Sequence, residues 1–468
     1  MTTYGRDLAV HETPIPGLLV IDLPVHGDDR GWFKENWQRE KLRELGVPDL
    51  GPVQNNISFN DAVGTTRGIH AEPWDKFISV ATGRVFGAWV DLRAGDSFGT
   101  VFTTEITGDV AIYVPRGIGN SYQSLEPDTA YTYLVNDHWS PDASYTFLNL
   151  ADETVAIDWP IPLADCELSD KDRNHPRLAD VVPFGPRKTL VTGADGQLGQ
   201  ALRRAFEGQD HVEFTDVAEL DLTADLSTAR AWKRYDTIIN AAAYTAVDKA
   251  ETPEGRAAAW KVNVEAVANL ARVATENQLT LVHVSSDYVF DGTQELHTED
   301  EALAPLGVYG QTKAAGDVVA STAPRHYVVR TSWVIGEGNN FVRTMASLAE
   351  RGIDPTVVDD QHGRLTFTDD LAAGIRHLLT ERPDHGTYNL SNTGDVSSWA
   401  TIAKRVYELT GHDPARVTPV STADYYASAE GPISPRPTHS ALDLAKITAT
   451  GFTARDADAA LVAYLSAE

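Results

Sequence analysis

Two residues suited to a proton transfer, Tyr309 and Lys313, lie four positions apart in the string YGQTK. On a helix this spacing puts both side chains on one face, where an ammonium favours the phenolate and prepares the phenol to donate a proton. The same pair also occurs on ordinary solvated helix faces. Ser285 and Ser286 end the apolar run of HVSSDYVF, where a hydroxyl could hold a substrate carbonyl oxygen. They favour the catalytic interpretation.

A glycine-rich turn, VTGADGQLGQ at 191–200, lies between an apolar run and an amphipathic one. Glycines at this spacing let the backbone approach a pyrophosphate at a helix N-terminus, which predicts a nicotinamide dinucleotide site. Asp216, which ends the next apolar run, is placed either to bind a ribose hydroxyl or to cap a helix. It favours NADH by repelling a 2′-phosphate, and NADPH stays open. The predicted cofactor contacts are Gly193, Asp195, Gly196, Gln197, Leu198, Gly199, Asp216, Ala241, Ala242, Ala243, Tyr309 and Lys313.

In the first half of the chain the most informative string is TTRGIH, which ends at His70. An imidazole held by a carboxylate is a well-oriented base, and Asp170 in LSDKD offers that carboxylate. Tyr133 could donate a proton on the opposite face, while Lys76 stabilises an enolate. These residues would epimerise a carbon beside a ketone. A lone histidine is often an ordinary surface or core residue, and LSDKD has a second interpretation as a polar turn.

Metal binding is not expected in the first half. Its histidines are His11, His26, His70, His138 and His175, and no two form an H-x-H pair in a strand. The chain's single cysteine, Cys166, excludes an intramolecular disulfide and a thiolate metal cluster, and fits a reducing compartment.

The charge balance narrows the range of partners. With 67 acidic and 39 basic residues in 468, the net charge of −28 disfavours nucleic acid and anionic membranes as partners. The N-terminus has no basic segment followed by an apolar run, and no stretch approaches membrane-spanning length. We expect a cytoplasmic protein.

Two patterns of elements divide the chain. Residues 18–160 hold short β-branched and aromatic runs separated by Gly, Asp and Pro, which predicts an all-β jelly roll of the cupin type. From 187 onward, apolar runs alternate with alanine-rich amphipathic segments, as in βαβ units on a parallel sheet. The Pro- and Gly-rich stretch 175–188 separates them, so we expect domains at 1–185 and 186–468.

The second half resembles the extended short-chain dehydrogenases, which have a Rossmann fold, and within them the dTDP-4-dehydrorhamnose reductases. The resemblance runs from 188 to about 465 and rests on TGADGQLG, NAAAYTAVDKAE, SSDYVFDG, YGQTK, RTSWVIG, NNFVRTM, DDQHGRLT and SPRPTHSALD. It implies Ser286 as the substrate-holding hydroxyl, Tyr309 as the general acid and Lys313 as the lysine of the Tyr–Lys pair. It also implies a small C-terminal substrate-binding region. It also implies that Tyr244, Trp333, Asn340 and Arg436 lie near a sugar nucleotide, although Trp333 has a core-packing interpretation.

The first half resembles the cupin-type dTDP-4-dehydrorhamnose 3,5-epimerases over about 15–175, through DDRGWFKENW, VQNN, RGIH, DKFISVATGRVF, VPRG, TYLVND and LSDKD. The resemblance implies His70 as the base, Asp170 as its partner and Tyr133 as the acid. It implies a pocket lined by Arg30, Glu35, Gln54, Asn56, Arg67, Lys76 and position 120. Two positions depart from the family pattern: Asn120 replaces a usual histidine and Gly87 a common acidic residue.

The two resemblances together imply a bifunctional enzyme of dTDP-L-rhamnose biosynthesis, dimeric through its first domain. It would epimerise dTDP-4-dehydro-6-deoxy-D-glucose at C3 and C5 and then reduce the C4 ketone with NADH or NADPH. Asn120 and Gly87 keep two alternatives open, namely epimerisation of one carbon, or a non-catalytic barrel attached to a reductase. The motifs do not distinguish dTDP from UDP as the carrier.

Overall fold

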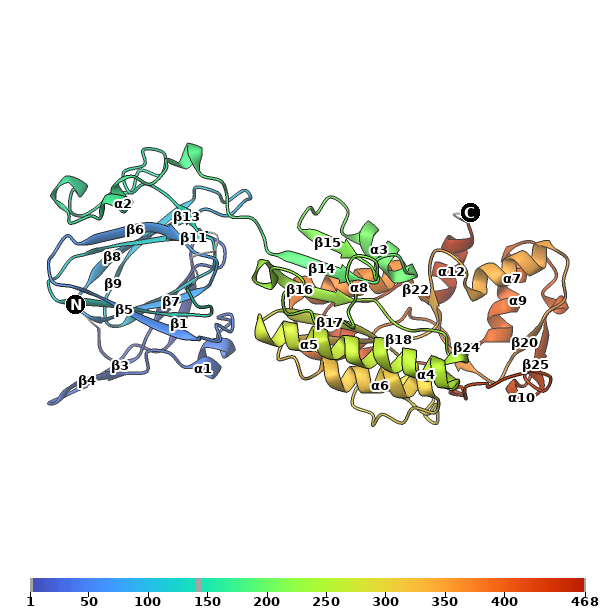
Figure 1. Ribbon diagram of the computed structural model, residues 1–468. Coiled ribbons are helices and arrows are strands. Elements are labelled where there is room, and N and C mark those ends of the chain that lie inside the picture. Colours follow the sequence, from blue (N-terminus) through green and yellow to red (C-terminus); the bar gives the residue numbers. More distant parts are fainter. Residues whose placement is uncertain (1–2, 140–144, 467–468) are drawn as a thin grey trace. The chain divides into compact units, whose positions relative to one another are not determined.

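The computed structural model describes residues 3–139 and 145–466 (Figure 1). The chain divides into two compact units, Met1–Pro186 and Arg187–Glu468. This division lies one residue from the boundary expected from the sequence.

The first unit is built from two antiparallel sheets, of strand order β1-β2-β10-β7-β12-β5 and β13-β6-β11-β8-β9. This arrangement confirms the predicted all-β jelly roll. A two-stranded hairpin, β3–β4, and two short helices accompany the sheets. The elements are β1 (Ala9–Glu12), β2 (Leu19–Asp22), β3 (Val25–Asp28), β4 (Gly31–Lys34), α1 (Arg39–Glu44), β5 (Gln54–Asn60), β6 (Thr66–Ala71), β7 (Lys76–Thr82), β8 (Val85–Asp91), β9 (Val101–Ile106), β10 (Val110–Val114), β11 (Ile118–Ser124), β12 (Thr129–Val135), β13 (Thr146–Phe147) and α2 (Asp170–Arg173).

The two sheets face each other across an apolar core that includes Ile78, Val80, Trp89 and Ile112. Aromatic residues join the sheets near the middle of this core. Tyr122 on β11 and Tyr131 on β12 stack with their ring centroids 4.1 Å apart. Asn120, whose side chain accepts a hydrogen bond from the Tyr131 hydroxyl beside these rings, is itself buried.

Helix α2 closes the first unit beside β6 (Figure 1). Ser169 caps it, because its hydroxyl accepts a hydrogen bond from the Asp172 backbone N–H at 3.1 Å. The Asn149 amide fixes the following residues by donating to the carbonyl oxygens of Arg173 and His175, both at 3.0 Å. The last turn of the segment is thus held against the barrel.

The second unit contains a six-stranded parallel sheet of order β15-β14-β16-β17-β18-β23, as the sequence predicts. Its elements are β14 (Lys188–Thr192), α3 (Gln197–Ala205), β15 (Val212–Thr215), β16 (Tyr235–Asn240), α4 (Pro253–Trp260), α5 (Ala266–Glu276), β17 (Thr280–Ser286), α6 (Val308–Ala320), β18 (His326–Thr331), β19 (Val334–Ile335), α7 (Phe341–Glu350), β20 (Thr356–Val358), β21 (His362–Gly363), β22 (Thr366–Phe367), α8 (Thr368–Glu381), β23 (Gly386–Asn389), β24 (Ser397–Ser398), α9 (Trp399–Leu409), β25 (Thr418–Val420), α10 (Thr422–Tyr425), α11 (Ala445–Ala449) and α12 (Ala457–Ser466).

Helices cover both faces of this sheet. Residues of α5 pack with Leu190 and Ile238 in one core, while residues of α3 and α8 pack with Val191 and Ile239 in the other. The strand order reverses between β14 and β16. In such sheets a crevice opens at the carboxyl ends of the strands at this point, and ligands bind there. The glycine-rich turn follows β14 and lies at this edge.

A third cluster of buried residues organises the C-terminal region. Val342 of α7, Val406 and Tyr407 of α9, and Leu461 of α12 pack together there. This cluster forms the small additional region expected after the nucleotide-binding sheet. Over the described residues, every helix is too short or too polar to cross a membrane.

Candidate active sites

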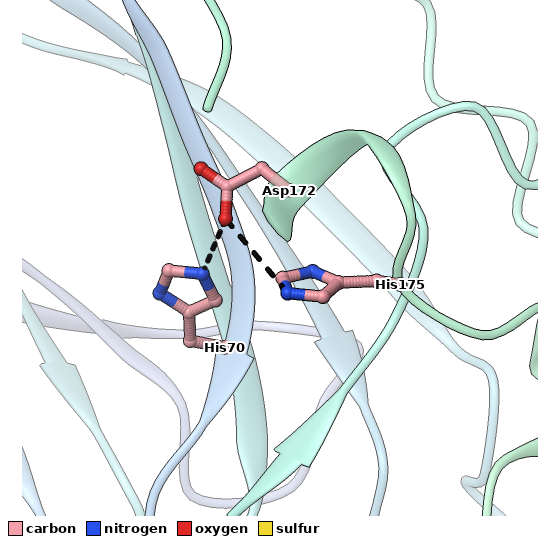
Figure 2. Close-up of side chains that lie close together, drawn as sticks. All are labelled: His70, Asp172 and His175. Carbon is pink, nitrogen blue, oxygen red and sulfur yellow. Dashed lines mark hydrogen bonds and ion pairs between the residues drawn. The ribbon is translucent and has the colours of Figure 1, made fainter. Parts of the chain in front are cut away.

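In the first unit His70 forms a hydrogen bond with Asp172. His70 Nε2 lies 2.8 Å from Asp172 Oδ1, and the carboxylate is 7% exposed (Figure 2). Burial alone would raise the pKa of Asp172, but the hydrogen bond and charge of His70 hold it below its ordinary value. The prediction that Asp170 is the partner of His70 is therefore wrong.

The capped start of α2 explains which carboxylate turns inward. With Ser169 as the N-cap, Asp170 is the first helical residue and is exposed, whereas Asp172 is the third and faces β6. The string LSDKD contains both residues, and its Ser-x-x-Asp spacing was the available signal for the cap. Without the position of β6 that signal does not choose between the two carboxylates.

His175, one turn further on, also lies beside this pair (Figure 2). Its ring meets the ring of His70 edge to face at 5.3 Å and stacks on Phe147 at 4.8 Å. Burial and the neighbouring His70 lower the pKa of His175. In the sequence, His175 is one of five histidines of the first half, and no motif marks it as a site residue.

On the opposite sheet, Lys76 and Tyr133 lie together. The Lys76 ammonium is 5.5 Å from the centre of the Tyr133 ring and forms an ion pair with Glu72. Burial and the Glu72 carboxylate raise the pKa of Tyr133, so the phenol stays protonated. Glu72 was missed by the sequence reasoning. It pairs with Lys76 inside the barrel and thereby compensates a buried ammonium.

Of the other residues expected to line this pocket, three have contacts on the side of Tyr133 and two have local contacts elsewhere. Gln54 donates to Asn56 at 2.8 Å, and Asn56 lies opposite Tyr133 in the strand register. Arg67 lowers the pKa of Tyr133 slightly and donates to Asn60 at 3.4 Å. The contacts described for Arg30 and Glu35 are local and place neither beside His70. Arg30 pairs with Asp28 at the hairpin turn, and Glu35 pairs with Lys41 of α1.

The two departures from the family pattern have separate structural explanations. Asn120 lies opposite His70 in the register, and its side-chain oxygen accepts a hydrogen bond from the Tyr131 hydroxyl at 3.3 Å. A β-carbon at Gly87 would collide with the Trp89 indole. Trp89 thus fills the space that an acidic side chain at position 87 would need.

In the second unit Ser286, Tyr309 and Lys313 come together at the end of β17 and the start of α6. Burial and the nearby Asp287 raise the pKa of Tyr309 to about 12, although a hydrogen bond with Ser286 acts to lower this pKa. Burial lowers the pKa of Lys313 to about 8, and its ammonium donates to the Val284 carbonyl at 2.7 Å. The phenol is protonated at neutral pH, and a cation lies on the same helix face.

Asp287 is a further buried acid that the sequence reasoning missed. Its carboxylate accepts a hydrogen bond from the Ser286 hydroxyl at 2.9 Å, and burial raises its pKa to about 6. The Asp287–Ser286 bond fixes the hydroxyl beside Tyr309. The sequence signal for a role of Asp287 is its position directly after Ser285 and Ser286.

The glycine-rich turn fits a dinucleotide. Gly193 adopts a φ of +71°, and a β-carbon there would lie 2.6 Å from the Ala242 backbone nitrogen. Asp216 accepts a hydrogen bond from the Asp195 N–H at 3.0 Å, which holds its carboxylate against the turn. Among the predicted contacts, Gly196 is the N-cap of α3, Gln197, Leu198 and Gly199 begin that helix, and Ala241 and Ala243 follow β16. A turn of this kind leaves the backbone accessible to a pyrophosphate without side-chain obstruction.

The residues expected near a sugar nucleotide differ in their surroundings. The Tyr244 hydroxyl is buried without a hydrogen-bond partner in the described part of the chain, and Tyr244 packs with Tyr309. Arg436 forms a two-point ion pair with Asp248 at 2.7 and 2.8 Å. Trp333 stacks on Trp399 at 3.7 Å, while the Asn340 side chain caps α7. The Tyr244 hydroxyl is therefore available to a ligand, whereas the Asn340 side chain is occupied in capping α7.

Together, the jelly roll with its His–Asp pair and the parallel sheet with its Ser–Tyr–Lys set define an epimerase joined to a nucleotide-dependent reductase. The sequence pattern of the dTDP-4-dehydrorhamnose 3,5-epimerase family matches residues 12–180, and that of the RmlD substrate binding domain matches residues 187–468. The chain belongs to both families.

Individual relatives match one half each. The protein RmlC homolog of Streptococcus pyogenes serotype M6 is 49% identical over 194 residues, covering 40% of this chain and 98% of that protein. The dTDP-4-dehydrorhamnose reductase of Mycobacterium tuberculosis is 38% identical over 276 residues, covering 57% of this chain and 88% of the relative. The dTDP-4-dehydrorhamnose reductase structure from Bacillus anthracis, in complex with NADP, has a TM-score of 0.55 at 32% identity and covers 60% of this chain and 98% of its own.

The two carboxylates of α2 give a matched pair of variants. Asp172→Asn should lower the epimerase rate roughly 100-fold, because a neutral amide no longer stabilises the positive charge that His70 gains when it takes up a substrate proton. Asp170→Asn should stay within about twofold of the parent, since its side chain is exposed. Deuterium uptake from D₂O into the keto-sugar measures both. Equal losses in the two variants would contradict the assignment.

The buried lysine predicts the pH dependence of the reductase. Lys313 carries its charge below its pKa of about 8 and loses it as the pH rises, so the rate should fall above that pH. Lys313→Met should lose about 100-fold at pH 7 and show no such decline. The measurement is NAD(P)H oxidation with the ketone substrate between pH 6 and 10. A flat profile in the parent enzyme would count against a catalytic ammonium.

Proposed function

We propose that this chain converts dTDP-4-dehydro-6-deoxy-D-glucose into dTDP-L-rhamnose by two successive reactions. The single observation that carries the proposal is that one chain holds two intact acid–base sets. The first unit has His70 hydrogen-bonded to Asp172 and Tyr133 beside Lys76. The second has Tyr309 and Lys313 buried on one helix.

In the first reaction His70 removes the protons at C3 and C5, which the C4 ketone makes acidic. A carboxylate only accepts hydrogen bonds, so the proton on His70 lies at Nε2, facing Asp172, and Nδ1 is the basic nitrogen. The Lys76 ammonium stabilises the enolate that forms. Tyr133, kept protonated by its surroundings, returns a proton to C5 from the opposite face, and a solvent water returns one to C3.

In the second reaction the residues of the second unit bind and protonate the C4 oxygen. A reduced nicotinamide, held along the glycine-rich turn, supplies the hydride. The Ser286 hydroxyl, fixed by Asp287, holds the oxygen while Tyr309 donates its proton to it. Lys313 favours the phenolate that remains. Asp216 at the turn favours NADH, and the NADP complex of the Bacillus anthracis relative supports NADPH.

The substrate is anionic while the protein carries a net charge of −28, so the diphosphate needs a fixed cation. Arg436 is the cation that we propose for the reductase half. Its side chain is 12% exposed and stands over the Tyr426 ring at 5.2 Å. Asp248 binds both terminal nitrogens of the guanidinium, and the Ser434 carbonyl accepts a second hydrogen bond from Nη1 at 2.5 Å. One N–H on Nη2 and the Nε–H remain for a phosphate oxygen.

The proposal is tested by incubating the protein with dTDP-4-dehydro-6-deoxy-D-glucose in D₂O without nicotinamide. Deuterium should enter both C3 and C5, as read by NMR, and His70→Ala should lose uptake at both. Uptake at one carbon would favour a single epimerisation, which Asn120 makes the main alternative. No uptake would mean that the first unit is a binding module of the reductase.

We also propose that the protein is a homodimer through its first unit. We further propose that it acts in the cytoplasm, a reducing compartment that its single cysteine fits. Strand β5 lies at the edge of its sheet and exposes Ile57 and Phe59, at 68% and 56%. The β3–β4 hairpin exposes Trp32 and Phe33, at 47% and 66%. An unpaired edge with neighbouring apolar side chains favours pairing with a second copy.

Light scattering after size exclusion tests the dimer. The parent chain should have twice the mass of one chain, and the double variant Ile57→Ser, Phe59→Ser should shift toward one chain while its reductase rate is unchanged. Val318→Ser, at an exposed apolar residue of the second unit, is the control. A monomeric parent would overturn the proposal.

A further inference from the structure

Three side chains from two segments of the first unit that are far apart in the sequence converge on one point. His70 comes from β6, Asp172 from α2 and His175 from the turn after it (Figure 2). One ligand atom from each lies within 4.8 Å of the others. Asp172 Oδ1 is 2.8 Å from His70 Nε2 and 3.9 Å from His175 Nε2. Two imidazole nitrogens therefore face the same carboxylate oxygen.

This set of atoms has the chemistry of a zinc site. Zinc binds imidazole nitrogen and carboxylate oxygen at about 2.0–2.2 Å, so neighbouring ligand atoms of a tetrahedral site lie roughly 3.3 Å apart. The observed separations of 2.8 and 3.9 Å lie on either side of that value. All three ligand atoms lie within 4.8 Å of one another, so rotation of the two imidazole side chains toward a common centre would complete the site, with a water in the fourth position.

The surroundings already hold these ligands in place. The His175 ring stacks on Phe147, its carbonyl oxygen accepts from the Asn149 amide, and its side chain is 10% exposed. His70, at 36% exposed, is the ligand that an ion reaches from solvent. An ion would thus replace a hydrogen bond without refolding the segment.

We propose that His70, Asp172 and His175 form an inhibitory site for a divalent ion of the zinc type. An ion on Nε2 of His70 displaces the proton from that nitrogen, and the neutral ring then carries its proton on Nδ1. Since Nδ1 is the basic nitrogen of the proposed epimerisation, the bound ion removes the base. The inhibition rests on the proposed function, whereas the binding does not.

The first test is calorimetric titration of the EDTA-treated full chain with Zn²⁺, with Mg²⁺ in excess to occupy surface carboxylates. We expect one tight equivalent in the parent and none in His175→Phe, a variant that keeps a ring on Phe147 but has no ligand nitrogen. His26→Phe, at an exposed histidine, is the matched control and should keep the equivalent. Equal binding by the parent and His175→Phe would overturn the site.

The second test is deuterium uptake by the same proteins. One equivalent of Zn²⁺ should slow uptake at least tenfold in the parent, EDTA should restore it, and His175→Phe should be insensitive. The reductase rate should not change. If His175→Phe fails to fold, Co²⁺ bound to the parent should give the strong visible absorption of a tetrahedral site, and weak octahedral bands would contradict it. Binding without any epimerase activity would refute the proposed function and leave the site intact.

Discussion

The burial of charged groups beside opposite charges is the constraint on which both sites depend. A buried ammonium or carboxylate is costly unless a partner compensates it. In the first unit the Glu72–Lys76 ion pair and the hydrogen bond between His70 and the Asp172 carboxylate meet this requirement. In the second, Asp317 forms a buried ion pair with Arg330 at 3.0 Å and supports the charge of Lys313. These pairs keep proton donors and acceptors between packed layers, where burial raises the pKa values of Tyr133 and Tyr309.

The same constraint connects the fold to the chemistry. The hydrogen bond that activates His70 joins two residues 102 positions apart in the sequence, so the base is complete only when α2 is packed against β6. The Tyr309–Lys313 set needs only one helix and the end of one strand. The epimerase half therefore depends on long-range closure of the barrel, while the core of the reductase set depends on local order.

That difference explains how much could be predicted from the sequence. Tyr309 and Lys313 were placed correctly on one face because their spacing is a helical period. The glycine turn was found because its backbone requirement is local. Asp172 was missed because helix α2 presents only one of two neighbouring carboxylates to β6, and His175 because its neighbours lie far away in the chain. The space opposite Gly87 depends on the Trp89 ring, which no spacing reveals.

In the proposed sequence of reactions, the product of the first site is the substrate of the second. The most direct measurement is the configuration at C3, C4 and C5 of the sugar formed from dTDP-4-dehydro-6-deoxy-D-glucose by the full chain with NAD(P)H, determined by NMR. We expect dTDP-L-rhamnose from the parent and none from His70→Ala. A reduced sugar that keeps the starting configuration at C3 or C5 would contradict this sequence of reactions.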